Sequence, residues 1–81
     1  MSCFVYLLEC NDRSLYCGCT RDLEKRLKLH NDGKASKYTR ARLPAKLVYR
    51  EKLETRALAL KREMQIKSLS RKEKLALTKR T

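Results

Sequence analysis

Several features that would point to particular classes of protein are missing from the sequence. No apolar run approaches the ~20 residues that a membrane span requires. The longest such run, residues 3–8, has no charged segment before it, so we expect no signal peptide. The sequence also shows no repeats, linkers or low-complexity segments. We therefore expect a cytoplasmic protein that does not associate with membranes.

A metal-binding cysteine motif is also missing. The four cysteines, Cys3, Cys10, Cys17 and Cys19, include no C-x-x-C pair, and His30 is the single histidine, so a zinc site would need all four sulfurs. Thiols stay reduced in the cytosol, and a free cysteine in an apolar strand behaves as a small hydrophobe. Structural thiols are therefore our expectation, and a disulfide or a metal site is the alternative.

Acidic residues are scarce. Nine Asp and Glu stand against 21 Lys and Arg in 81 residues, which gives a formal net charge of +12. Repulsion among these positive charges lowers the stability of the fold, and a polyanionic partner would reduce it. Nucleic acid is the commonest such partner. The basic residues begin at Arg13 and are not gathered in a tail, so the folded domain itself is basic. A merely well-solvated surface is the weaker alternative.

Local patterns predict a small α+β domain. Residues 3–8 and 15–19 fit two strands, and the polar residues 11–14 between them suggest an antiparallel hairpin. A helix should follow over residues 21–31 with Thr20 as its N-cap, and then a loop or short helical turn over residues 34–43. Because Pro44 stops any preceding helix, residues 45–50 should form a third strand.

Two further helices complete the prediction. Thr55 is a suitable N-cap for a helix over residues 56–69, and residues 70–73 form a capping-box pattern for a last helix that ends near residue 79. The expected fold is α/β in the broad sense (α+β), with a three-stranded antiparallel sheet, flanking helices and the order β-β-α-β-α-α. So short a chain forms one domain with a small core, so any active site should lie on an exposed face.

Most single residues in this pattern have ordinary explanations. Strand tyrosines such as Tyr6 and Tyr16 are usually packing residues, although Gly18 marks a bulge or a close backbone approach. Glu63 is harder to explain, because it falls between Ala59 and Ile66 on a face that looks apolar. A carboxylate there should be paired, bound to a metal or placed at a cleft, and an i,i+4 ion pair with Lys67 is the simple alternative.

The combined pattern resembles the GIY-YIG nuclease superfamily. Residues 4–6 (Phe-Val-Tyr) stand where the family has Gly-Ile-Tyr, and residues 16–18 (Tyr-Cys-Gly) stand for Tyr-Ile-Gly. The likeness continues through residues 20–31, 37–40, 43–44, 47–49 and 57–67. It spans residues 2–77, which we interpret as one GIY-YIG domain, and it is greatest to the small stand-alone bacterial members. Phe4 and Cys17 depart from the family pattern at scaffold positions only.

The resemblance implies a metal-dependent endonuclease that hydrolyses DNA phosphodiester bonds. Tyr6 and Tyr16 match the two motif tyrosines, Arg26 the helix arginine, and Glu63 the ligand of a single divalent metal. His30 matches a helix position that is often histidine in related subfamilies. A carboxylate ligand favours Mg²⁺ or Mn²⁺, and the planar guanidinium of Arg26 suits phosphate oxygens.

The division of labour between the tyrosines stays open at this point. We assign Tyr16 as general base or proton relay, and Tyr6 as the residue that orients the water or contacts phosphate. His30 could share in proton transfer.

Loop residues supply candidate nucleic-acid contacts. Phosphate contacts are expected from basic residues, and a base can stack on one tyrosine. The predicted set is Arg13, Arg21, Lys37, Tyr38, Arg40 and Arg42. For each of these, a solvated surface position is the alternative.

The sequence leaves the form of the substrate and the partners open. The substrate DNA could be branched or single-stranded, and a protein partner could direct so small a domain. Two rival functions remain: a catalytically inactive nucleic-acid-binding module, and a small basic protein associated with RNA or the ribosome.

Overall fold

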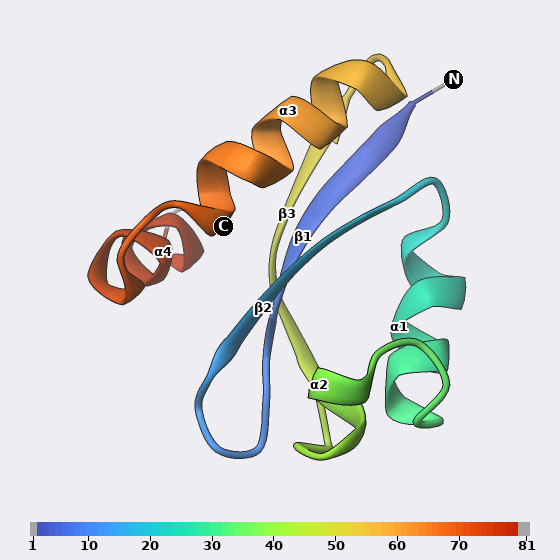
Figure 1. The fold of residues 1–81 in the computed structure, drawn as a ribbon. Helices are drawn as coiled ribbons and strands as arrows, with labels where there is room; N and C mark the ends of the chain where they lie inside the picture. The colour runs from blue at the N-terminus through green and yellow to red at the C-terminus, as the bar shows by residue number, and fades with distance from the viewer. Residues whose placement is uncertain (1, 80–81) are drawn as a thin grey trace.

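A computed structural model describes residues 2–79, which form one small sheet with helices on both faces (Figure 1). The elements are β1 (Cys3–Glu9), β2 (Leu15–Thr20), α1 (Leu23–Asn31), α2 (Lys37–Arg40), β3 (Lys46–Leu53), α3 (Arg56–Lys67) and α4 (Arg71–Thr78). The sheet is antiparallel with the strand order β2-β1-β3. The predicted α+β fold is confirmed, and α2 is the short helical turn expected within residues 34–43.

The central strand β1 is covered on both faces. Its alternate residues Cys3, Val5 and Leu7 pack against Ala59 and Ile66 of α3, and all five are at most 1% exposed. The residues between them face the other way, where Leu23 and Leu27 of α1 and the segment leading into β3 cover them. The sheet therefore separates α3 and α4 from α1 and α2 (Figure 1).

The N-cap predicted for α1 was wrong by two residues. Asp22 caps this helix, and its carboxylate accepts the backbone N–H of Lys25 at 3.1 Å. Thr20 is still part of β2, and its hydroxyl oxygen accepts the Asp22 N–H at 3.2 Å. A threonine that continues a strand is not free to begin a helix, so the next acidic residue takes that position.

The caps of the later helices agree with the prediction. Thr55 accepts the Leu58 N–H at the start of α3, and Ser70 and Glu73 form the expected capping box of α4. The strand β3 extends to Leu53, beyond the predicted end at residue 50, because its pairing with β1 continues to Cys3. Helix α3 ends at Lys67, two residues before its predicted end.

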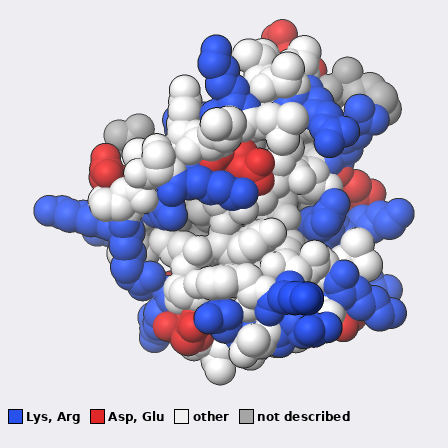
Figure 2. Space-filling view, viewed as in Figure 1, with Lys and Arg blue, Asp and Glu red and all other residues white. Residues whose placement is uncertain are grey.

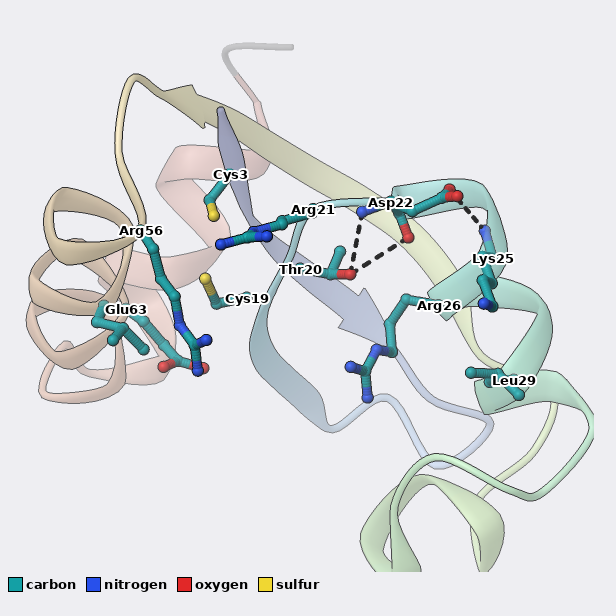
Figure 3. Close-up of a pocket in the computed structure, with 11 residues that line it drawn as sticks. Cys3, Cys19, Thr20, Arg21, Asp22, Lys25, Arg26, Leu29, Arg56 and Glu63 are labelled. Atoms are coloured by element: carbon teal, nitrogen blue, oxygen red, sulfur yellow. Dashed lines mark hydrogen bonds between the residues drawn. The ribbon is translucent and has the colours of Figure 1, made fainter. Parts of the chain in front are cut away.

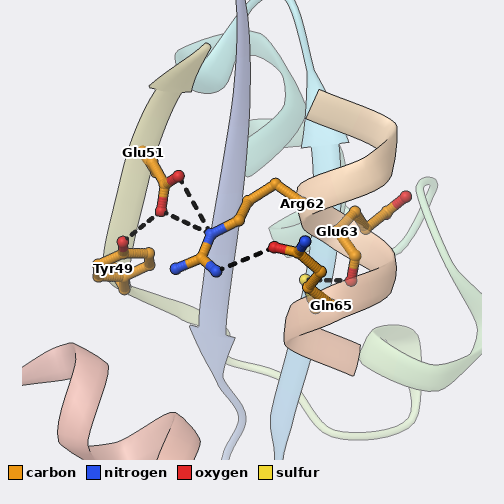
Figure 4. A network of polar contacts seen from close by, with 6 residues as sticks. Tyr49, Glu51, Arg62, Glu63 and Gln65 are labelled. Carbon is orange, nitrogen blue, oxygen red and sulfur yellow. Dashed lines mark hydrogen bonds and ion pairs between the residues drawn. The ribbon is translucent and has the colours of Figure 1, made fainter. Parts of the chain in front are cut away.

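A half-buried polar network joins α3 to β3 (Figure 4). The Arg62 Nε–H points at both carboxylate oxygens of Glu51, each at 3.1 Å, and the Tyr49 hydroxyl donates to Glu51 at 2.6 Å. Arg62 also donates to the Gln65 side chain at 3.2 Å. Together with the apolar packing of Ala59 and Ile66, this network ties α3 to the sheet.

The four cysteines are free thiols, and Cys3, Cys10 and Cys17 are buried. Burial, and then the carboxylate of Glu63, raise the pKa of the Cys17 thiol to about 11. Cys17 is therefore neutral at physiological pH and packs as a small hydrophobe. Among residues 2–79, no helix has the length and apolar character that crossing a membrane requires.

Candidate active site

The hairpin places Tyr6 directly against Gly18. The two residues are register partners on β1 and β2, and a Cβ at position 18 would overlap the hydroxyl oxygen and ring of Tyr6. Only glycine leaves room for the tyrosine in this position. The close backbone approach that the sequence suggested at Gly18 is thus its contact with the ring and hydroxyl of Tyr6.

Tyr6 continues into a buried polar chain. Its hydroxyl oxygen lies 2.9 Å from His30 Nε2, and His30 Nδ1 lies 2.8 Å from the Thr39 hydroxyl oxygen. Tyr6, His30 and Thr39 are 3%, 1% and 0% exposed. Burial, and then the neighbouring Tyr16, raise the pKa of Tyr6, so its phenol keeps its proton. Burial, and then the charge of Arg26, lower the pKa of His30, so the imidazole is neutral at pH 7.

Tyr16 is the more exposed of the two motif tyrosines. Its ring meets that of His30 edge-on at 5.2 Å and stacks on Tyr38 at 5.9 Å with an interplanar angle of 28°. The guanidinium carbon of Arg42 lies 4.0 Å from the centre of the Tyr38 ring. The ring of Tyr38 thus packs between neighbours within the domain, and it supports Tyr16.

A cleft of about 590 Å³ lies across the outer edge of β2, between α1 and α3 (Figure 3). Arg26 enters it from α1 and Glu63 from α3, while Cys19 and Thr20 of β2 form its floor. Helices on opposite faces of the sheet thus bring an arginine and a carboxylate to one hollow. Tyr6, Tyr16 and His30 form the separate cluster beside Arg26 and do not line this hollow.

Two of the possibilities weighed for Glu63 hold together, because it is paired and it also lies at a cleft. Its side chain is 16% exposed and pairs with Lys67 across one helical turn at 3.5 Å, which is the i,i+4 ion pair. The Lys67 side chain is 57% exposed, and an ion pair with such a partner contributes at most about 1 kcal/mol. The carboxylate also lines the cleft, so the pair with Lys67 does not account for its position.

The donors in the cleft suit one kind of metal ion. Within residues 2–79, no group of three or more His, Cys, Asp or Glu side chains is gathered for a metal. Asp22, the other carboxylate at the cleft, is engaged as the cap of α1. Mg²⁺ usually binds one or two carboxylates and fills its remaining positions with water and substrate phosphate oxygens. Glu63 fits that pattern, and zinc with four protein ligands does not.

Of the six predicted nucleic-acid contacts, the structure places Arg21 at the cleft. The others lie on the hairpin turn and on or beside α2, toward the other end of β2. Arg42 is engaged within the domain, because it donates to Asp12 at 3.0 Å and to the Tyr38 carbonyl at 2.9 Å.

Sequence reasoning missed two basic residues of the cleft, Lys25 and Arg56. Arg56 stands seven residues before Glu63, two helical turns away on the same face of α3, and this spacing could have identified it. Figure 2 shows Lys and Arg side chains around the central hollow of this face, with acidic side chains at its margin.

Comparison with known protein families identifies the domain. The model of the GIY-YIG catalytic domain matches residues 2–76. The chain belongs to the GIY-YIG family. Because this is a nuclease superfamily, the general substrate of the domain is nucleic acid, and such nucleases generally use a divalent metal.

Relatives match this GIY-YIG domain over most of their own length. A UPF0213 protein of Bacillus velezensis is 55% identical over 71 residues, which cover 88% of this chain and 72% of the relative. A UPF0213 protein of Staphylococcus saprophyticus is 49% identical over 74 residues, covering 91% of this chain and 90% of the relative.

The solution NMR structure of a UPF0213 protein from Bacillus halodurans has a TM-score of 0.63 and 42% identity. That match covers 98% of this chain and 84% of the other. The GIY-YIG fold of the chain is therefore shared with an experimental structure.

Proposed function

We propose that this GIY-YIG domain is a metal-dependent endonuclease that hydrolyses phosphodiester bonds of DNA. The observation that carries the proposal is the cleft at the edge of β2, which Arg26 and Glu63 line from helices on opposite faces of the sheet. A binding surface alone would need only the positive charge. A carboxylate such as Glu63 inside a basic cleft opposes the binding of phosphates unless a cation sits between them.

Arg26 and Glu63 each have a chemical role in this proposal. Arg26 offers two N–H donors to the phosphate oxygens, on which negative charge grows during the attack by water. Glu63 would hold a Mg²⁺ or Mn²⁺ ion. Such an ion supplies Lewis-acid chemistry, which stabilises the charge on the phosphate and on the leaving oxygen.

The two tyrosines differ in exposure and in bonding, which supports different roles. Tyr16 is partly exposed, and we keep it as the proposed general base or proton relay. Tyr6 is buried and holds its proton, and we propose that it positions the attacking water or a phosphate oxygen. His30 takes part through its contact with the Tyr6 hydroxyl.

The basic residues suggest the course of the nucleic acid. Arg21, Lys25 and Arg56 lie at one end of the β2 edge, and the turn and α2 residues lie toward the other. A strand that runs along this edge would pass Arg26 and Glu63 on its way. Branched and single-stranded DNA are both compatible with this course, and a directing protein partner also remains a proposal.

A cleavage panel tests the proposal. The purified protein is incubated with single-stranded, duplex, nicked, flapped and four-way DNA, in Mg²⁺, in Mn²⁺ and in EDTA. We expect cleavage of at least one substrate with either metal ion and none in EDTA.

The rival functions predict other outcomes of the same panel. Binding that weakens steeply with salt, with no turnover of any substrate, would replace the enzyme with an inactive binding module. Co-purification with ribosomes and no affinity for DNA would favour the RNA-associated protein.

A further inference from the structure

The polar chain beneath Tyr6 crosses three elements of the fold. It runs from Tyr6 on β1 through His30 on α1 to Thr39 on α2, and it ends at the backbone carbonyl of Ser36. The Thr39 hydroxyl lies 3.3 Å from that carbonyl oxygen. Thr39 is fully buried, so its hydroxyl is shielded from bulk water.

A neutral imidazole carries one proton, so the chain can be arranged in two ways. In the first, His30 carries the proton on Nδ1 and donates it to Thr39, while Tyr6 donates to Nε2. In the second, His30 carries the proton on Nε2 and donates it to Tyr6, while Thr39 donates to Nδ1.

Counting donors distinguishes the two arrangements. In the first, all three donors have acceptors, because Thr39 passes its own proton to the Ser36 carbonyl. In the second, the Tyr6 O–H has lost its acceptor, and the structure gives this hydroxyl no other partner within residues 2–79. In the second, an acceptor for Tyr6 would have to come from a water or a ligand, whereas the first satisfies every donor within the fold, so the first arrangement is favoured.

We propose that Thr39 is a positioning residue that holds His30 in the Nδ1–H tautomer and thereby fixes the direction of the Tyr6 hydroxyl. Tyr6 then donates its proton to His30 Nε2, and the lone pairs of its oxygen remain available as acceptors. Without the acceptor that Thr39 presents to Nδ1–H, the imidazole proton would be free to move to Nε2.

The tautomer decides between the two roles left open for Tyr6. Resting on the proposed nuclease function, an acceptor oxygen on Tyr6 orients the attacking water, because water can donate to it. A phosphate oxygen offers no proton, so Tyr6 in this state cannot hydrogen-bond to it. By holding this tautomer, Thr39 leaves the Tyr6 oxygen able to accept a hydrogen bond from the attacking water and unable to donate one to phosphate.

The tautomer can be observed directly, because the chain has a single histidine. Long-range ¹H–¹⁵N correlation spectra of the ¹⁵N-labelled full chain, recorded above pH 7.5, distinguish a protonated from an unprotonated ring nitrogen. We expect Nδ1 protonated and Nε2 unprotonated in the wild type. A spectrum with the proton on Nε2 would overturn the proposal, and it would do so without any variant.

Two substitutions test the part played by Thr39. Thr39→Val keeps the shape of the side chain and removes the hydroxyl, so the imidazole proton should move wholly or partly to Nε2. Thr39→Ser keeps the hydroxyl and should keep the wild-type tautomer. If Thr39→Val folds and retains the Nδ1–H tautomer unchanged, Thr39 does not set it.

Cleavage provides a second readout. Thr39→Val should lower kcat on the order of tenfold with little change in KM, and Thr39→Ser should restore it. Equal kcat values in the two variants would contradict the link to the reaction. If the wild type cleaves no substrate, the proposed function fails, while the spectra still decide the tautomer.

Discussion

At the scale of single residues, Gly18 has the most specific requirement in the site. Its missing side chain is the space that the Tyr6 hydroxyl occupies. In Gly18→Ala we expect Tyr6 to move away from His30, at a stability cost of about 1–3 kcal/mol. Cleavage should fall about tenfold or more, while binding of DNA by the cationic residues persists. Thermal unfolding, His30 spectra and cleavage rates check these effects together.

Gly33→Ala is the matched control for this substitution. Gly33 has a φ of 75°, so alanine there is strained, but its Cβ would meet only the flexible Arg40 side chain. The control should lose stability and keep the His30 spectrum of the wild type. If both variants leave that spectrum unchanged, the contact between Tyr6 and Gly18 does not position the hydroxyl.

Individual residues were predictable from sequence to different degrees. The candidate Glu63 stood out because a carboxylate interrupts an apolar helical stripe, and it does lie between the buried Ala59 and Ile66. The bond from Thr39 to His30 was not predictable, because the eight residues between them hold a helix end and a loop whose path no local pattern specifies. The packing of Tyr38 on Tyr16 is tertiary in the same way.

At the scale of elements, we expect the junction of α3 with β3 to help set the direction of Glu63. Glu63 follows Arg62 directly, and Arg62 is bonded to Glu51 of β3 (Figure 4). The two side chains are 31% and 26% exposed, so their pairing is partly shielded from water. A double-mutant cycle with Glu51→Gln and Arg62→Gln should give a coupling free energy of about 1 kcal/mol in chemical denaturation. A coupling near zero would mean that the apolar packing of Ala59 and Ile66 alone holds α3 in place on the sheet.

The type and order of elements followed from local sequence patterns, while some of their ends did not. The helix α1 starts two residues late because Thr20 is bound into β2, and β3 runs on because β1 offers pairing partners as far as Cys3. Both differences come from pairing between strands. Local propensity does not contain that information.

At the scale of the whole molecule, charge and fold act together. The net charge of +12 predicted a polyanionic partner, and the fold shows which cations share a surface with Glu63. We predict the contribution of one cleft residue, Arg56, to the salt dependence of nucleic-acid binding. Removal of one phosphate contact lowers the slope of log affinity against log salt by about 0.7–0.9.

Arg56→Gln should show this smaller slope in fluorescence anisotropy titrations with labelled DNA in EDTA. Arg71→Gln is the matched control, since Arg71 is an exposed residue at the start of α4, outside the cleft. Its slope should equal that of the wild type. Equal slopes for Arg56→Gln and the wild type would place the nucleic acid on another face.

The most direct test of the central claim is the cleavage rate of Glu63→Ala beside Glu54→Ala, in Mg²⁺ and on whichever DNA the wild type cuts. Glu54 is an exposed carboxylate just before α3, so its removal changes the net charge equally. Glu63→Ala should lose cleavage by about a thousandfold or more while it keeps its fold and most of its DNA affinity. Glu54→Ala should cut as the wild type does. A folded Glu63→Ala protein that still cuts at the wild-type rate would contradict the assignment of Glu63 as the metal ligand, and with it the proposed active site.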